Sequence, residues 1–268
     1  MKIKKLSAVI AFVLILLSSL SFIPLNAKGA VVESDSEVPI ALYFHRNNTM
    51  NTTPPAVGVE AKASLKDGGS ITFFSPELKE DLTVNTIYCN VSFYLEIKVT
   101  QVHTPHTDPN ETVDVKLSFS FENPELRAEA TEWFEDVIEW SGWKTVNLTY
   151  DKTGKVTLKK YSNLTLKISS KAVPSSILAY NYNVTLYYDE KNYASQVSFP
   201  CSPVTATVTT EGGTEFKPYA PTPEIPFKGN IKDAFDNEDL KEVRLEINGP
   251  GYHYTTPPLE NITPGDYT

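Results

Sequence analysis

The chain has 268 residues and a formal net charge of −9, with 24 Lys and Arg against 33 Asp and Glu residues. Binding to nucleic acid requires clustered Lys and Arg, so the acidic balance argues against a nucleic-acid partner. Two cysteines are too few for a disulfide-dense small domain, and the length suffices for one large core and a small additional module.

Residues 1–27 have the pattern of a secretory signal peptide. Lys2, Lys4 and Lys5 precede an apolar run, and Ala27 supplies a small residue at the expected cleavage position. The apolar run is also long enough for an uncleaved membrane anchor. Pro24 and the small residues that follow the run favour cleavage after Ala27, and in either arrangement the remainder of the chain is exported.

From residue 40 onward, apolar and polar residues alternate, as in strands that bury one face. The clearest segments are 89–100 and 112–121. The other expected strands are 40–45, 70–75, 146–150, 164–168, 182–188 and 197–201. This succession predicts an all-β domain over residues 33–210.

One segment breaks the alternation and predicts a helix inserted into the β domain. Its apolar residues at helical spacing are Leu126, Ala130, Trp133, Phe134, Val137 and Ile138. Asn123 can cap this helix, Pro124 suits its first turn, and Gly142 can end it. We expect it to pack over one end of a sheet. The alternative is a helix on a membrane surface or a partner, which its acidic polar face disfavours.

Three segments of the main domain resemble secreted jelly-roll domains of archaeal and bacterial surface proteins. They are ALYFH, SITFFSPELKEDLTV and VTLYYDEKNYASQVSFP. The last is similar to a closing motif of the form lyyDs…pSxlxlp, with Glu190 in place of a serine and Ala194-Ser195 in place of Pro-Ser. The resemblance implies a jelly-roll-like β-sandwich but no particular chemistry, because such folds host many functions.

After the main domain, residues 211–226 contain four prolines and two glycines, as in a semi-rigid linker. Residues 227–268 then resemble a carboxypeptidase regulatory-like, or prealbumin-like, β-domain. The motifs that carry the resemblance are Gly229-Asn230-Ile231 with Asp233, the strand Val243/Leu245/Ile247, the sequence NGPGY, and Pro264-Gly265-Asp266-Tyr267. Domains of that family are longer, which predicts that the chain ends inside one.

Asparagine-linked glycosylation is the modification that the sequence indicates most strongly. The acceptor triplets begin at Asn47, Asn51, Asn90, Asn110, Asn147, Asn163, Asn183 and Asn261. Random placement would produce about three such triplets. The acceptors within predicted strands all fall on the polar face, so several are expected to carry sugar. The alternative is that Asn and Thr merely fill solvated strand faces.

Cys89 and Cys201 both fall on the apolar faces of expected strands. An exported protein meets an oxidising environment, and an even cysteine count leaves no thiol over, so we expect a disulfide between them. The alternative is two separate buried thiols that pack as small apolar groups.

No catalytic motif is present: G-x-S-x-G, H-E-x-x-H, phosphate loops and G-x-G-x-x-G are all missing from the sequence. We therefore expect no catalytic residue and no cofactor. His103, His106 and Asp108 are candidate ligands for zinc or copper. Two prolines around them predict an exposed, turn-rich loop instead, so we expect no metal site there.

Aromatic residues suggest one binding surface. Tyr94 and Tyr187 point outward on expected strands, and Trp140 and Trp143 flank Gly142. Such rings can stack on sugars. Outward aromatics are also ordinary strand formers, and the two tryptophans would equally fit a plug at the end of the core.

These features predict an exported, N-glycosylated, non-catalytic cell-surface protein with a structural or adhesive role. The expected partners are other envelope proteins or surface glycans, and membrane contact is limited to the N-terminal segment or an anchor beyond residue 268. The composition favours an archaeal envelope. One alternative is a carbohydrate-binding accessory module of a larger secreted protein or enzyme; another is an enzyme whose catalytic domain follows residue 268.

Overall fold

A computed structural model of the chain contains two compact units. It describes residues 8–13, 31–32, 38–58, 60–100, 112–173, 181–210, 227–235, 240–249, 252–255, 259–262 and 265–267. The larger unit spans residues 37–201, and the smaller one combines residues 1–36 with 202–268. The predicted linker 211–226 and most of the predicted signal peptide lie outside the described residues.

The larger unit consists of strands and one 3-10 turn, η1 (Arg46–Asn48). The strands are β3 (Val38–His45), β4 (Thr49–Asn51), β5 (Ala61–Leu65), β6 (Ser70–Phe74), β7 (Leu82–Asn85), β8 (Cys89–Thr100), β9 (Val113–Asn123), β10 (Leu126–Val137), β11 (Glu139–Tyr150), β12 (Lys155–Leu158), β13 (Thr165–Val173), β14 (Asn181–Tyr188) and β15 (Gln196–Ser202). There is no α-helix among the described residues, so the all-β prediction is confirmed.

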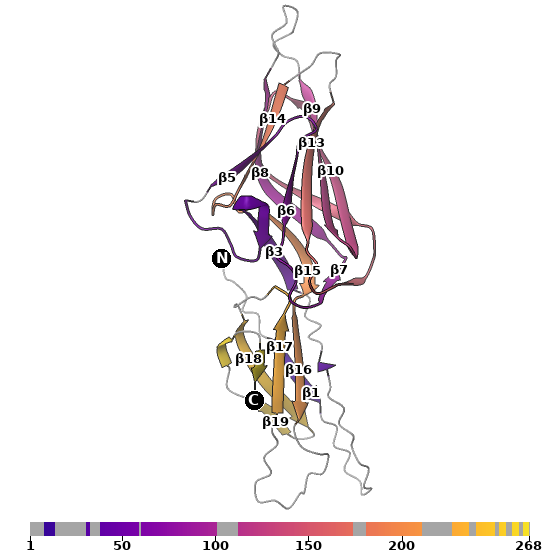
Figure 1. Ribbon diagram of the computed structural model, residues 1–268, viewed down its shortest axis with the longest axis vertical. Coiled ribbons are helices and arrows are strands. Elements are labelled where there is room, and N and C mark those ends of the chain that lie inside the picture. Colours follow the sequence, from indigo (N-terminus) through magenta and orange to yellow (C-terminus); the bar gives the residue numbers. More distant parts are fainter. Residues whose placement is uncertain are drawn as a thin grey trace, which may run out of the picture. The chain divides into compact units, whose positions relative to one another are not determined.

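The strands of the larger unit pair in the order β12-β7-β15-β3-β4-β6-β13-β9-β10-β11-β8-β14-β5. A further pairing of β15 with β8 closes the nine strands from β15 to β8 in this order into a ring. Within the ring all neighbours are antiparallel except β4 and β6, so the unit is a mixed barrel. Figure 1 shows β13, β9 and β10 running side by side in this barrel. β7 and β12 extend the sheet beyond β15, and β14 and β5 extend it beyond β8, so β12 and β5 are its edge strands.

The core of the barrel is filled by alternate residues of the strands. On β9 every second side chain from Val113 to Phe121 is buried, as the period-two pattern predicts. Aromatic rings make contact across the interior: Phe93 lies 5.2 Å from Phe119, and Phe44 stacks on Phe73 at 4.6 Å between ring centroids. Burial of each such ring stabilises the fold by about 2–3 kcal/mol.

The predicted helix after Asn123 is wrong, because this segment forms β10 and the start of β11. Its apolar residues fit both periods. In the structure Leu126, Ala128 and Phe134 are buried at even spacing, whereas Trp133 is 45% exposed. β9 already presents a strictly alternating partner, and pairing with it satisfies the backbone groups of β10 over most of its length. This tertiary pairing overrides the helix propensity of an Ala- and Glu-rich segment.

The predicted disulfide is also wrong for this structure, in which Cys89 and Cys201 are buried free thiols. β8 pairs with β15 so that Asn90 lies opposite Ser198. One residue further, this register places Cys89 opposite Phe199, two positions short of Cys201. Such diagonal positions have Cα atoms about 7–8 Å apart, which is beyond the usual reach of a disulfide.

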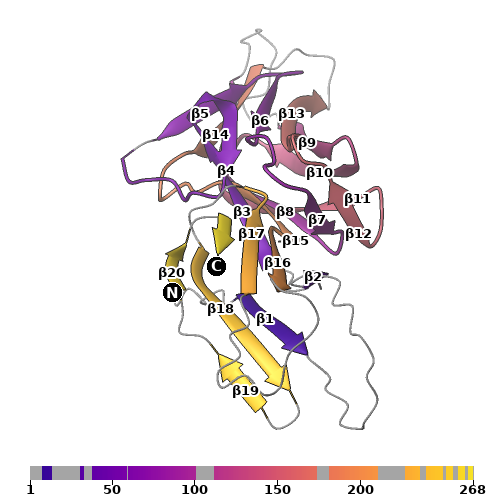
Figure 2. The same cartoon turned by 60° about the horizontal axis from the view of Figure 1, so that its bottom comes forward.

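The smaller unit is also built from strands. They are β1 (Ala8–Val13), β2 (Val31–Val32), β16 (Val204–Thr210), β17 (Phe227–Asp233), β18 (Leu240–Gly249), β19 (Tyr252–Thr255), β20 (Leu259–Ile262) and β21 (Gly265–Tyr267). They form two sheets, β2-β16-β17-β21 and β1-β18-β19 with β20 also on β18 (Figure 2). β1 lies inside the predicted signal peptide, so cleavage after Ala27 would remove the parallel neighbour of β18.

The strand assignment of β10 predicts opposite outcomes for two adjacent residues. Phe134→Ala should lower the free energy of unfolding by about 3 kcal/mol, because the ring is buried. Trp133→Ala should cost only about 0.5–1 kcal/mol, because that ring is half exposed and the Lys116 ammonium lies 5.5 Å from its centroid. Urea denaturation measures both values. A helix would bury both rings, so equal large losses would contradict the strand.

The free thiols predict how the cysteines react. Burial raises the pKa of the Cys89 thiol to about 12, so at pH 8 only about one molecule in ten thousand carries the reactive thiolate. Ellman's reagent should therefore titrate no fast thiol in the native protein and two thiols after unfolding without reductant. If no thiol titrates in the unfolded protein, the cysteines are bridged and the arrangement described above is incorrect.

Candidate functional site

Three aromatic side chains lie in one row across the outer face of β11, β8 and β14. Strand register aligns Trp143 with Tyr94, and Tyr94 with Tyr187. The ring of Tyr94 lies 6.0 Å from that of Trp143 and 5.6 Å from that of Tyr187, both edge-to-face. The neighbours of Tyr94 in β8, Phe93 and Leu95, are buried in the core, so alternation directs the row outward.

Tyr193 joins this row from the turn between β14 and β15. Its ring lies 4.8 Å from that of Tyr94 and 5.2 Å from that of Tyr187. Ser195, which is 1% exposed, holds the turn in place: its hydroxyl donates to the carbonyl of Tyr187 at 2.7 Å and accepts from the Tyr94 amide at 3.4 Å. The four rings of Tyr94, Trp143, Tyr187 and Tyr193 are called the aromatic row below.

Charged groups border the aromatic row on its β5 side. The Lys62 ammonium lies 4.6 Å from the centroid of the Tyr187 ring and pairs with Glu60 at 2.7 Å. The Tyr187 hydroxyl donates to Glu96 at 2.9 Å, and Lys98 pairs with Glu96 at 2.6 Å. Hydrogen bonding from Lys98 holds the pKa of Glu96 below its usual range, and the bond to Glu96 raises the pKa of Tyr187. The row therefore has apolar faces with a carboxylate and ammonium groups beside them.

The structure brings together three of the four aromatic residues expected to stack on sugar and separates the fourth. Trp143 is 50% exposed within the row. Trp140 points to the opposite face of β11, where its ring meets Phe134 edge-to-face at 5.0 Å. Its indole also lies across Gly142, since a Cβ there would be 3.4 Å from the ring. Tyr193 was missed because nothing in the sequence indicates where its turn lies relative to β8.

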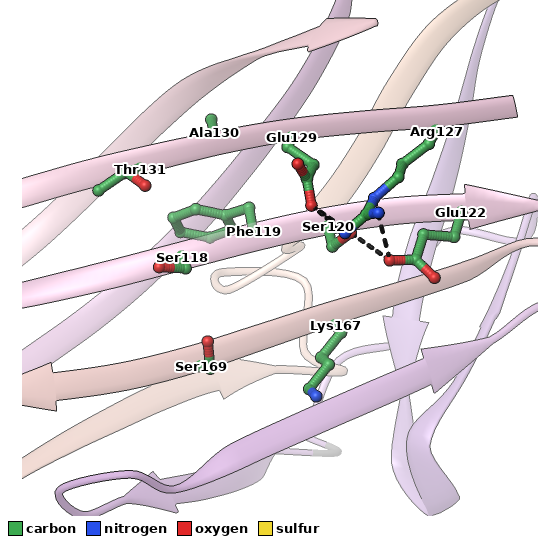
Figure 3. A pocket seen from close by; sticks show the side chains of 10 residues that line it. All are labelled: Ser118, Phe119, Ser120, Glu122, Arg127, Glu129, Ala130, Thr131, Lys167 and Ser169. Carbon is green, nitrogen blue, oxygen red and sulfur yellow. Dashed lines mark hydrogen bonds and ion pairs between the residues drawn. The ribbon is translucent and has the colours of Figure 1, made fainter. Parts of the chain in front are cut away.

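A polar cleft of about 430 Å³ lies on the outer surface of β9, β10 and β13. Figure 3 shows Arg127 next to Glu122 and Glu129, with Ser120 linked to both carboxylates and Lys167 on the neighbouring strand. Arg127 already pairs with Glu122 at 3.6 Å and with Glu129. Because these charges neutralise each other, the cleft is a weaker candidate than the aromatic row.

His45 and Asp189 form a pair that a catalytic triad would also contain, with 2.8 Å between Nδ1 and Oδ1. Nε2 of His45 faces Asn51 Oδ1 at 3.0 Å and the Thr53 carbonyl at 3.1 Å, and not a hydroxyl group. The pair thus has no nucleophile at the position that a triad requires. Asp189, which is 6% exposed, also accepts from the Arg46 backbone N–H at 2.9 Å. These contacts fix the turn after β3.

That turn carries two glycan acceptors with suitable geometry. Asn47 is exposed in η1. In Asn51 the side-chain oxygen accepts from the Thr53 N–H at 2.8 Å and lies 3.0 Å from His45 Nε2. A backbone N–H can only donate, so the contact with Thr53 defines the orientation of the amide and turns Nδ2, the atom that receives sugar, away from that donor.

In two other acceptors the side-chain nitrogen Nδ2 donates hydrogen bonds within the fold. Nδ2 of Asn163 donates to the carbonyl of Ser75 at 2.9 Å. Nδ2 of Asn183 donates to Thr185 at 3.0 Å and to Ser64 at 3.3 Å. Sugar at either position replaces one of the two N–H groups of the amide. At Asn183 both have an acceptor, so one hydrogen bond is lost, at a cost of about 0.5–1.5 kcal/mol.

The remaining candidate residues from the sequence lie either in strands or outside the residues that the structure describes. Asn90 and Asn147 lie directly opposite each other on β8 and β11, and Asn261 lies in β20. Asn110, and the metal candidates His103, His106 and Asp108, lie outside the described residues. Among the residues that the structure describes, no three His, Cys, Asp or Glu side chains are grouped to hold a metal. No helix in that part of the chain could span a membrane.

No protein-family model and no curated protein matches this chain. It is similar to parts of several solved structures. An aminopeptidase from a marine sediment archaeon, Thaumarchaeota archaeon, has a TM-score of 0.46 and 9% identity over 62% of this chain and 37% of its own. A CocE/NonD family hydrolase from Staphylococcus aureus has a TM-score of 0.39 and 11% identity over 62% and 36%. An α-amino acid ester hydrolase has a TM-score of 0.39 and 10% identity over 60% and 36%. The chain thus spans little more than a third of these proteins, and the likeness does not identify a function.

The amide geometry predicts unequal glycan occupancy. Asn47 and Asn51 should be more fully modified than Asn163, because Nδ2 of Asn163 is held by a hydrogen bond to the backbone carbonyl of Ser75, which restricts its approach to the glycosylating enzyme. All three triplets end in Thr, so acceptor chemistry is matched. Mass spectrometry of glycopeptides from the native protein measures each occupancy. Full modification of Asn163 with unmodified Asn51 would show that the folded geometry does not control the pattern.

Proposed function

We propose that this protein is an exported, N-glycosylated, non-catalytic protein of the cell surface that adheres by binding carbohydrate at its aromatic row. The observation that carries this proposal is the alignment of Trp143, Tyr94 and Tyr187 in one register row with Tyr193 against it. Aromatic rings offer apolar faces on which the C–H face of a sugar ring can stack. Glu96, Lys62 and Lys98 lie close enough to bind its hydroxyl groups.

A rigid support favours a binding role for these rings over a purely structural one. Each ring of the row contacts at least one other. Tyr94 and Trp143 stand on strands of the closed ring, and Tyr187 stands on β14, which pairs with β8. A preorganised surface loses little conformational entropy when a ligand binds. The large apolar indole of Trp143 is 50% exposed beside the other rings, as in surfaces that bind a ligand.

The non-catalytic assignment draws support from the His45–Asp189 pair. This pair acts within the fold, because its outer nitrogen is taken by Asn51 and Thr53. We also propose that residues 33–210 are related to the secreted jelly-roll domains that the sequence resembles. Residues 227–268 would then be related to carboxypeptidase regulatory-like β-domains.

A carbohydrate-binding accessory module of a larger secreted protein or enzyme is the second candidate, and the same aromatic row supports it. The two candidates differ in what the row binds. An adhesive envelope protein would bind glycans of cell surfaces, whereas an accessory module would bind the polymer that its attached enzyme degrades. A glycan array that includes both classes separates them.

The row predicts a matched pair of tryptophan variants. Trp143→Ala should weaken sugar binding by about 1–2 kcal/mol, five- to thirtyfold in Kd, because the half-exposed indole of the row is lost as a stacking surface. Trp133→Ala removes an indole of similar exposure from β10 and should leave binding unchanged. Titration calorimetry with the best oligosaccharide from the array measures both values. If no glycan binds, or if only Trp133→Ala reduces binding, the proposed site is refuted.

A further inference from the structure

Each of the three strand residues in the aromatic row has a glycan acceptor four residues away on its own strand. The pairs are Asn90 with Tyr94 on β8, Asn147 with Trp143 on β11, and Asn183 with Tyr187 on β14. An even spacing places both members on the same face of the sheet. Four residues of strand span about 13 Å. The acceptors therefore bracket the row on its own surface, with Asn90 and Asn147 at one end and Asn183 at the other.

We propose that the glycan on Asn147 folds back along β11 and stacks on Trp143 and Tyr94, so that the aromatic row is occupied by the chain's own sugar. This inference rests on the proposed function, since it assumes that the row binds carbohydrate. It adds a regulatory consequence: glycosylation of Asn147 closes the row to free sugar, and chains without that glycan have an open row.

Asn147 is the best placed of the three acceptors. It is exposed, whereas its cross-strand partner Asn90 is half-buried. Opposite residues on antiparallel strands have Cβ atoms only about 4.5–5.5 Å apart, so a glycan on both would crowd the same space. The amide of Asn183 is tied to Thr185 and Ser64.

The surface between Asn147 and Trp143 is low and polar. Thr145 is the one outward residue of β11 between them, and it lies opposite Ser92 of β8. The hydroxyls of Thr145 and Ser92 hydrogen-bond to each other at 2.9 Å. These small side chains leave room above them for a sugar chain and offer hydroxyl groups to it. The path ends at the edge-to-face rings of Trp143 and Tyr94.

Because the glycan is covalently attached at Asn147, even a weak affinity for the aromatic row is sufficient for it to occupy the row. A tethered ligand acts at an effective concentration of about 1 mM. If the free oligosaccharide binds with a Kd of about 0.1 mM, the tethered copy weakens capture of free sugar on the order of tenfold. The affinity of the row for external glycans would then depend on how many chains carry sugar at Asn147.

The test compares full-length glycoproteins made in the native host, all carrying Trp133→Phe so that Trp143 is the half-exposed indole that remains. Asn147→Gln and Thr149→Ala both remove the triplet, and the second keeps the asparagine itself. Asn47→Gln removes the acceptor in the η1 turn, away from β11, and is the matched control. Acrylamide quenching reports the exposure of Trp143. Calorimetry reports binding of oligosaccharide released from the native protein by hydrazinolysis.

We expect both Asn147→Gln and Thr149→Ala to increase quenching and to bind the free oligosaccharide on the order of tenfold more tightly than the parent, while Asn47→Gln matches the parent. Equal quenching in all variants, or an Asn147 without sugar in the native protein, overturns the inference. Unglycosylated chain from a non-glycosylating host tests the proposed function separately. If that chain binds the oligosaccharide and Trp143→Ala abolishes binding, the proposed function holds. It then holds even when the quenching result shows that the Asn147 glycan does not occupy the aromatic row.

Discussion

The pairing of β15 with β8 is the constraint on which the rest of the larger unit depends. It closes nine strands into a ring, so every alternate side chain is committed either to the interior or to the outer face. A slip of one residue would exchange the two faces and expose the apolar core. The outward direction of Tyr94 and Trp143 is therefore a consequence of burying Phe93, Leu95 and Val146.

β8 changes neighbours along its length, and the aromatic row lies at the change. Its C-terminal half pairs with β14 as far as Tyr94 and Tyr187, and its N-terminal half pairs with β15 from Ser92 and Gln196. The chain must turn between β14 and β15 at this point. That turn contributes Tyr193, and its buried Ser195 hydrogen-bonds to Tyr187 of β14 and to Tyr94 of β8. A fourth ring is thus added where the sheet is already rigid.

The same turn also supports the turn after β3 that contains the Asn47 and Asn51 triplets. Asp189 follows β14 directly and binds the His45 ring and the Arg46 backbone. His45 in turn contacts the Asn51 amide. Residues 189–195 thus hold two features that are separate in the sequence, a loop with two acceptor triplets and an aromatic surface. The polar cleft over β9, β10 and β13 differs from the aromatic row, because no exposed ring lines it and its Arg127 pairs with Glu122 and Glu129.

Sequence alone determined the all-β class, most strands and the inward or outward direction of their residues, because a period of two is a local property of the chain. It also found Tyr94, Tyr187, Trp143 and the acceptor asparagines. It failed where two periods fit equally, as in β10, since only the alternating partner β9 decides between them. It failed for the cysteines because a bridge depends on register, and register is set by pairing between distant strands. Tyr193 and the inward turn of Trp140 were likewise decided by tertiary structure, which alone brings distant segments within contact distance.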